Sequence, residues 1–243
     1  MFCNINFNIT NRNALFLHSD KNRTKLIIPV NAKLIVDANT SKRFFELLNN
    51  NYVTFDGQIP YLIAKLFNRK YKDVIKLAGS DIVFDFSGLA QKNGYKIFFL
   101  GGKEKSNKLA VSNIKEQYNI LIEGYSPAFE DYPFSDKFNL SCMEKIADFS
   151  PEILFVGFGA PKQEYWLSDH IETLYKIGVK YAIGCGGTFD FLSQEIKRAP
   201  VFIQKMGLEG LYRLYQEPNK IRYKRLINSL KFIKYIWRRP FFE

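Results

Sequence analysis

The sequence is poor in the residues that build metal and redox sites. Its 243 residues include three cysteines, Cys3, Cys142 and Cys185, and only two histidines. Three widely separated cysteines form neither a zinc-type spacing nor a disulfide framework, which fits a reducing compartment. Two histidines are too few for a His-rich metal site. We therefore expect no metal to be bound.

Long apolar runs are missing as well. No window holds about 18 consecutive apolar residues, so we expect no membrane-spanning helix. The polar start MFCNINFNITNRN lacks the apolar core of a signal peptide, and the expected location is therefore the cytoplasm. Apolar residues still make up 47% of the chain, which is enough to bury a core and argues against disorder along the whole length.

Several motifs of nucleotide and metal chemistry are also absent. The sequence has no Gly-x-Gly-x-x-Gly and no Walker lysine motif, so NAD binding and P-loop chemistry are unsupported. No Asp-x-Asp stands near a predicted strand end, which weakens the case for a divalent-metal glycosyltransferase or phosphatase. We expect no cofactor.

The positive charge is concentrated at one end of the chain. The net charge is +11, and the residues from 196 onward contain twelve lysines and arginines against three glutamates, so they carry +9 of it. The rest of the chain is nearly neutral. A basic end on a neutral body is typical of a protein that meets one anionic surface.

Short apolar runs alternate with helical patterns over most of the chain. The runs predict strands at 25–31, 52–57, 95–102, 120–125, 152–159 and 180–187. This alternation predicts an α/β fold, a Rossmann-like, mostly parallel sheet with helices on both faces. Beyond about residue 196 the sequence is helical, aromatic and basic. We therefore expect an α/β core over 1–195 and a basic helical, membrane-associating appendage over 196–243.

Four of the predicted strands end in glycine or Asp-Gly, which places several turns at one rim of the sheet. Ligands of open α/β sheets bind outside the carboxyl ends of the strands. Gly101 and Gly102 precede a polar helix whose N-terminus could hold a phosphate. Glycine also serves simply to close a tight turn, but several such turns together favour a site.

The stretch LFVGFGAPKQEYW, residues 154–166, ends the fifth predicted strand. Glycine at 157 and 159 lets a ligand approach the backbone closely, and Pro161 turns the chain. Lys162 and Gln163 can meet diphosphate or sugar oxygens, while Glu164 caps the helix or orients a partner. The alternative is an ordinary helix start with solvated charges.

Two aspartates follow predicted strands. Asp56, in TFDGQ, can act as a general base at the rim, or it can serve as the turn aspartate that Asp-Gly favours by itself. Asp190, in GGTFDF, can bind a ribose hydroxyl or a base edge, or cap the next helix. Local sequence does not separate these roles.

The stretches PEILFVGFGAPKQEYW, GCGGTFDFLSQEIKRAP and GLEGLYRLYQEP resemble the bacterial WecG/TagA/CpsF glycosyltransferases, glycosyltransferase family 26. The resemblance covers about residues 26–225. It implies inverting, metal-independent transfer of an N-acetylmannosamine-type sugar or a hexose from a UDP-sugar to a polyprenyl-diphosphate-linked saccharide. Such enzymes work at the cytoplasmic membrane face on teichoic acid, enterobacterial common antigen, capsule or exopolysaccharide.

The resemblance also implies roles for particular residues. Asp56 would be the catalytic base, Asn31 and Gln163 would line the sugar and diphosphate site, and appendage arginines would complete the site over the leaving diphosphate. The expected substrate-binding residues are Asn31, Gly57, Lys76, Asp81, Gly101, Gly102, Gly157, Gly159, Pro161, Lys162, Gln163, Glu164, Gly187, Asp190, Arg198, Arg213, Arg222 and Arg225.

The sequence departs from the family pattern at three positions. Pro29 replaces a usual threonine, Lys76 a usual arginine and Gly210 a usual tryptophan. Lysine keeps the positive charge of arginine but loses its bidentate fork. These departures do not change the reaction class that the resemblance implies, but they leave the identity of the donor sugar undetermined.

Residues 219–243 have the composition of an interfacial helix. Leu226, Leu230, Ile233 and Trp237 share one side of a helical wheel, and lysines and Arg238 lie on another. We expect this segment to hold the protein peripherally on the anionic inner face of the membrane. The alternative is that the apolar side docks on the core.

Two other functions are compatible with parts of the sequence. One is a catalytically impaired nucleotide-sugar-binding membrane protein, which the departures at Pro29 and Lys76 suggest. The other is a basic nucleic-acid-binding protein; because the tail contains no recognised nucleic-acid motif, we expect no nucleic-acid partner. A homo-oligomer is compatible with the sequence.

Overall fold

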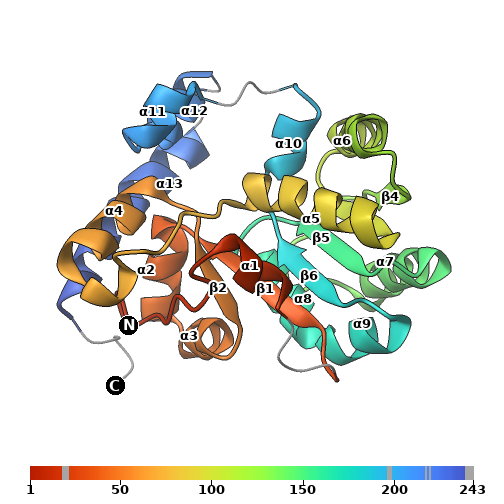
Figure 1. Ribbon diagram of the computed structural model, residues 1–243, viewed down its shortest axis with the longest axis horizontal. Coiled ribbons are helices and arrows are strands. Elements are labelled where there is room, and N and C mark those ends of the chain that lie inside the picture. The colour runs from red at the N-terminus through yellow and green to blue at the C-terminus, as the bar shows by residue number, and fades with distance from the viewer. Residues whose placement is uncertain (18–21, 196–198, 217, 219, 239–243) are drawn as a thin grey trace. The chain divides into compact units, whose positions relative to one another are not determined.

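The strands form a mostly parallel sheet in the computed structural model, which describes residues 1–17, 22–195, 199–216, 218 and 220–238 (Figure 1). The order is β2-β1-β6-β5-β3-β4. The strands are β1 (Lys25–Val30), β2 (Tyr52–Phe55), β3 (Ile97–Gly101), β4 (Ile122–Tyr125), β5 (Ile153–Gly157) and β6 (Tyr181–Gly184). Pairings β1–β6, β6–β5, β5–β3 and β3–β4 are all parallel. The expected Rossmann-like α/β class is confirmed.

The chain folds as two compact units whose boundary passes through β1. Unit 1 comprises the described residues of Met1–Leu17, Ile28–Ala78 and Arg198–Glu243, and unit 2 those of His18–Ile27 and Gly79–Lys197. The C-terminal helices thus group with the N-terminal part of the chain. The expected division into 1–195 and 196–243 stays a prediction about function.

Unit 2 has helices on both faces of its strands. They are α5 (Gly79–Asn93), α6 (Glu104–Tyr118), α7 (Asp136–Phe149), α8 (Lys162–Asp169), α9 (Ile171–Ile177) and α10 (Thr188–Leu192). The chain leaves β3 through α6 to reach β4, then crosses back through α7 to β5 on the other side of β3. Right-handed crossovers in opposite directions put α6 and α7 on opposite faces. Helices α5, α6 and α10 pack together on one of them (Figure 1).

The point where the chain reverses direction across the sheet lies between β3 and β5. These strands are adjacent, and their register pairs Gly101 with Gly157 at the carboxyl ends. Such a switch point is where open α/β sheets bind ligands. All residues of β3 are buried, and β5 is buried up to Val156, as expected for parallel strands covered on both faces.

Unit 1 is built around an aromatic cluster and incorporates the C-terminal segment. Phe7 stacks on Phe55 with ring centroids 3.7 Å apart, and Tyr71 meets Phe55 edge-on. Phe232 is only 1% exposed, and the Cys3 thiol points at its carbonyl. The remaining elements of this unit are α1 (Arg12–Phe16), α2 (Ala32–Thr40), α3 (Lys42–Asn49), α4 (Gln58–Phe67), η1 (Arg69–Tyr71), α11 (Val201–Lys205), α12 (Glu209–Gln216), α13 (Lys220–Leu230) and η2 (Lys231–Ile236).

Some helices differ from the sequence patterns. The helical stretch expected at 32–50 is two helices, because Ser41 is extended (φ −132°) and its hydroxyl caps α3 by accepting from the N–H of Phe44. The stretch expected at 162–177 is likewise divided at His170. The patterns do not predict α5 or α7, although both are long.

Candidate active site

In unit 1, the ends of β1 and β2 bring Asp56 beside Asn31. The N–H of Asp56 donates to the carbonyl of Val30 at 3.1 Å, so the residues that follow the two strands are neighbours. Both side chains are half-buried. A carboxylate and a carboxamide thus stand together where two strands end.

Lys76 lies on the other side of Asp56. Phe55 forms a parallel bridge with Lys76, and the N–H of Leu77 donates to the carbonyl of Phe55 at 2.9 Å. The hydroxyl of Thr54 donates to the carbonyl of Leu77 at 2.8 Å and secures the same segment. The expected group of Asn31, Asp56 and Lys76 is therefore brought together by backbone pairing.

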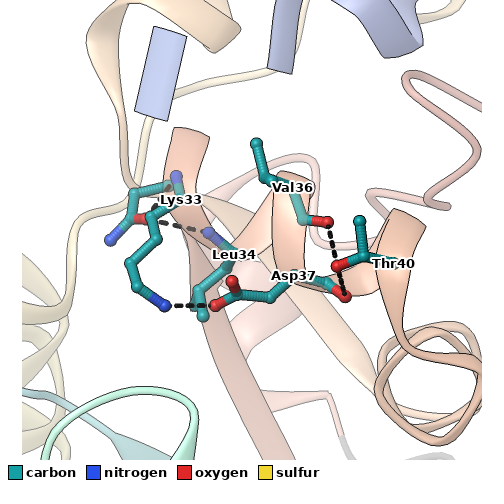
Figure 2. Close-up of polar contacts among 6 residues, drawn as sticks. Lys33, Leu34, Val36, Asp37 and Thr40 are labelled. Atoms are coloured by element: carbon teal, nitrogen blue, oxygen red, sulfur yellow. Dashed lines mark hydrogen bonds and ion pairs between the residues drawn. The ribbon is translucent and has the colours of Figure 1, made fainter. Parts of the chain in front are cut away.

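The side chain of Asn31 also forms the N-cap of α2. Its Oδ1 accepts from the N–H groups of Lys33 at 3.0 Å and Leu34 at 3.2 Å. Figure 2 shows polar contacts along α2, with Lys33 ion-paired to Asp37 and, at the end of the helix, the hydroxyl of Thr40 donating to the carbonyls of Val36 and Asp37. Because the oxygen is engaged in the cap, a ligand contact by Asn31 would use its NH₂ group, which is a donor.

Gly57 separates Asp56 from the start of α4. A Cβ at this position would lie 3.2 Å from Cδ of Pro60 and 3.6 Å from the backbone nitrogen of Ala32. The first turns of α4 and α2 therefore approach each other beside Asp56. Helix N-termini carry partial positive charge, which favours an anionic group between them, and the start of α4 has no side-chain cap.

In unit 2, three of the glycines expected near the ligand pack directly against aromatic rings of the protein. Cβ atoms would lie 2.8 Å from the ring of Phe158 at Gly101, 2.9 Å from Phe189 at Gly102 and 2.8 Å from Phe189 at Gly157. Gly101 and Gly102 also have positive φ angles, 93° and 72°. Close packing inside the protein thus requires glycine here, and the expected contact with a donor stays a prediction.

Gly159 and Gly186 differ from these three. Both have positive φ, 85° and 56°, and no atom lies within 4 Å of a Cβ built on either residue. Their turns face open space beyond β5 and β6. Gly159 therefore remains a candidate for close approach of a ligand to the backbone. Gly186 is a second candidate of the same kind, although the sequence analysis named its neighbour Gly187.

Gln163 links these two turns from inside the protein. Its Oε1 accepts from the N–H groups of both Gly159 and Gly186 at 3.1 Å, and its Nε2 donates to Oε1 of Glu164 at 2.8 Å. Both side chains are buried. They lie against β6, where a Cβ on Gly184 would come within 2.8 Å of Nε2 of Gln163. The carboxylate of Glu164 thus holds the side chain of Gln163, and the expected contact of either residue with substrate stays a prediction.

Lys162 is paired with a carboxylate on the loop after β4. Its Nζ lies 2.6 Å from Oδ1 of Asp131 and 5.0 Å from the ring centroid of Phe129. The preceding residue, Pro161, follows a cis peptide bond. A diphosphate approaching Lys162 would have to compete with Asp131 for the ammonium group.

The other expected residues are distributed among helices. Asp81 lies in the first turn of α5, Asp190 in the first turn of α10, and Gly187 is the N-cap of α10. Arg213 lies in α12, and Arg222 and Arg225 lie in α13, but their side chains are outside the described part of the structure, as is all of Arg198. Whether these residues bind substrate, and which role Asp190 has, stay predictions.

Sequence reasoning missed Asn107, which shapes the end of β3. Its Nδ2 donates to the carbonyls of Phe99 at 3.0 Å and Gly101 at 2.8 Å. A Cβ on Gly124 would lie 2.0 Å from Oδ1 of Asn107, so only glycine at this position of β4 leaves room for the asparagine side chain. A polar residue on the buried side of an amphipathic helix is the signal that could have revealed it.

The described residues provide no thiolate and no metal cluster. Burial, with a smaller effect from Glu164, raises the pKa of Cys185, so its thiol stays protonated at neutral pH. Within residues 1–17, 22–195, 199–216, 218 and 220–238, no three His, Cys, Asp or Glu side chains are grouped so that they could hold a metal ion. The same residues contain no helix long and apolar enough to cross a bilayer.

A Rossmann-like sheet with glycine turns at its carboxyl edge and a carboxylate at a strand end is suited to group transfer from a nucleotide. The model of the glycosyl transferase WecG/TagA/CpsF family matches residues 3–243, and the chain belongs to this family. The resemblance seen in the sequence is thereby confirmed. The protein is a glycosyltransferase of a family that serves cell-surface polysaccharide synthesis.

A characterised relative supports this assignment. The chain is 31% identical over 210 residues to the N-acetylglucosaminyldiphosphoundecaprenol N-acetyl-beta-D-mannosaminyltransferase of Bacillus subtilis (strain 168). The match covers 85% of this chain and 77% of the relative.

Replacing Gln163 with alanine should loosen both turns that it joins. The half-buried N–H groups of Gly159 and Gly186 would lose the side-chain acceptor 3.1 Å away, and each hydrogen bond of this kind contributes about 0.5–1.5 kcal/mol. We expect a lower free energy of unfolding and faster amide hydrogen exchange at both glycines. Gln117→Ala, at an exposed glutamine on α6, is the control and should change stability by less than about 0.5 kcal/mol. Unchanged protection of both amides would show that Gln163 does not hold the turns.

Proposed function

We propose that the protein transfers an N-acetylmannosamine-type sugar or a hexose from a UDP-sugar to a polyprenyl-diphosphate-linked saccharide, with inversion at the anomeric carbon. The similarity to the Bacillus subtilis enzyme, an N-acetyl-beta-D-mannosaminyltransferase that acts on N-acetylglucosaminyldiphosphoundecaprenol, carries this proposal. The place of Asp56 at the end of β2, beside Asn31 and Lys76, supports it.

In the proposed reaction Asp56 takes the proton of the acceptor hydroxyl. The hydroxyl oxygen then forms a bond to the anomeric carbon while the bond from that carbon to the diphosphate oxygen breaks, and UDP leaves with the electron pair. Negative charge grows on the leaving diphosphate. The N-termini of α2 and α4 and the ammonium group of Lys76 are the unit 1 groups suited to offset it. Arg198, Arg213, Arg222 and Arg225 remain candidates for the same task.

Asp56→Asn should lower turnover about 10²–10⁴-fold, the usual contribution of a general base. The amide is nearly isosteric but cannot accept the proton, so folding should be intact. UDP release with a lipid-linked acceptor measures the effect, and Asp73→Asn, at an exposed aspartate of the same unit, is the control. Near-normal turnover in Asp56→Asn would remove Asp56 from this role.

The same assay distinguishes catalysis from an impaired nucleotide-sugar binder. Pro29 is buried in β1, and Lys76 stands where the family usually has arginine; these two departures are the observations that favour the impaired alternative. Release of UDP by the unaltered protein excludes that alternative. Binding of a UDP-sugar without UDP release supports it.

We propose that the transfer needs no divalent metal, because no Asp-x-Asp follows a strand. A chelator such as EDTA should then leave the rate of UDP release unchanged. A chelator-sensitive rate that Mg²⁺ or Mn²⁺ restores would contradict the proposal.

The C-terminal segment is proposed to bind the anionic inner surface of the membrane. Leu230, Ile233 and Trp237 are exposed, whereas Phe232 between them is buried in unit 1. Most of the apolar side chains that we expected to contact lipid are therefore exposed and do not pack against unit 1. Lys224, Lys231 and Lys234 are exposed alongside them.

Changing Lys224, Lys231 and Lys234 to glutamine should weaken binding to anionic vesicles about a hundredfold, since each basic residue near such a surface contributes about 1 kcal/mol. Substitution is preferable to truncation because Phe232 belongs to the core of unit 1. Vesicle flotation measures the effect, with Lys115, Lys137 and Lys145 of unit 2 changed to glutamine as the charge-matched control. An equal loss of vesicle binding in the control would show that net charge, and not this segment, determines binding.

The nucleic-acid alternative is tested with DNA. Strong DNA binding that weakens as the salt concentration rises would favour it.

A further inference from the structure

Helix α4 exposes most of its large apolar side chains, and the residues that it buries fully are small. Pro60 and Ala64 are buried, whereas Leu62 is 47% exposed and Leu66 76% exposed. Ile59 is also exposed, and the spacings of three and four residues put it on the same face as these leucines. A surface helix normally shows the reverse pattern. An apolar face of this kind marks an interaction surface.

The residues that follow α4 are basic. Arg69, Lys70 and Lys72 are exposed in and directly after η1, and Asp73 is the acidic residue beside them. An apolar helix face flanked by cations is the composition of an interfacial helix. A second copy of the chain would carry the same net charge of +11, so repulsion disfavours it as the occupant. An anionic bilayer has the complementary charge.

This surface is continuous with the C-terminal segment within unit 1. The rings of Phe67, at the end of α4, and Trp237 meet edge to face with centroids 6.1 Å apart. At the other end of α4, a Cβ on Gly207 would lie 2.7 Å from Cγ1 of Ile59. The two segments therefore expose neighbouring apolar and basic side chains.

We propose that α4, η1 and the lysine that follows them, residues 58–72, form a second membrane-binding element that lies in the interface of an anionic bilayer beside the C-terminal segment. The functional consequence rests on the proposed glycosyl transfer. Helix α4 begins two residues after Asp56, so contact of α4 with the membrane holds the candidate base at the level of the headgroups. A diphosphate-linked acceptor presents its sugar at that level.

The apolar contribution is tested with the full chain carrying both Leu62→Glu and Leu66→Glu. Binding is measured by flotation with vesicles of phosphatidylglycerol and phosphatidylcholine. We expect at least about tenfold weaker partitioning, because two carboxylates would have to enter the interface. Leu121→Glu together with Leu140→Glu, at leucines of unit 2 that are 62% and 61% exposed, is the charge-matched control and should bind as the unaltered protein does.

The electrostatic contribution is tested separately with Arg69→Gln and Lys72→Gln. We expect about a fivefold loss for each charge removed, and only with anionic vesicles. Both positions are exposed, so this variant keeps the proposal testable if the glutamate variant fails to fold. Unfolding midpoints of all variants establish that each is folded.

Unchanged vesicle binding in a folded leucine variant and in the basic-residue variant would overturn the proposal. If light scattering shows that the unaltered protein is a dimer and the leucine variant is a monomer that still binds vesicles, a second copy of the chain covers α4. This result would also overturn the proposal. Failure of the proposed function is recognised separately, by the absence of UDP release from the unaltered protein with any acceptor. With a short-chain, water-soluble acceptor the α4 variants should retain full turnover.

Discussion

Parallel hydrogen bonding between buried strands is the constraint on which the rest of the structure depends. Strands that pair in this way must all end at one edge, and each must be reached by a crossover that covers a face of the sheet. In unit 2 this forces the ends of β3, β5 and β6 together. The reversal of direction between β3 and β5 then leaves a place where the helices diverge, and the glycine turns lie there.

Side-chain packing decides what those glycines do. Phe189 and Phe158 fill the space that side chains at 101, 102 and 157 would need, whereas Gly159 and Gly186 face open space. The space beside the three inner glycines is thus filled by the buried ring of Phe189 and the half-buried ring of Phe158, whereas the space beside the two outer glycines is open. Gln163 holds the two turns in one geometry by accepting from both backbone amides. A rigid pair of turns loses little entropy when a ligand binds.

Unit 1 contains both the candidate base and the C-terminal segment that we propose to bind the membrane. Asp56 is placed by the backbone bond to Val30 and is followed at once by Gly57 and α4. The C-terminal helices belong to the same unit, with Phe232 in its core. With the lipid-linked acceptor that we propose, this arrangement would couple the position of the carboxylate to surface binding, because both are carried by the same packed elements.

The sequence by itself determined the alternation of buried strands and helices, the carboxyl-edge position of the polar residues, the family and the basic C-terminal segment. Each of these follows from local patterns: apolar runs, glycine at strand ends, contiguous motifs and charge. Only the tertiary structure decided that Phe189 occupies the space beside Gly102 and Gly157, that Gln163 is an internal link, and that Phe232 docks while its neighbours do not. It also decided that α4 turns Leu62 and Leu66 outward. The physical reason is that residues distant in the chain fill, or leave open, the space beside a glycine or over a helix face. Local sequence patterns do not show which distant residues these are.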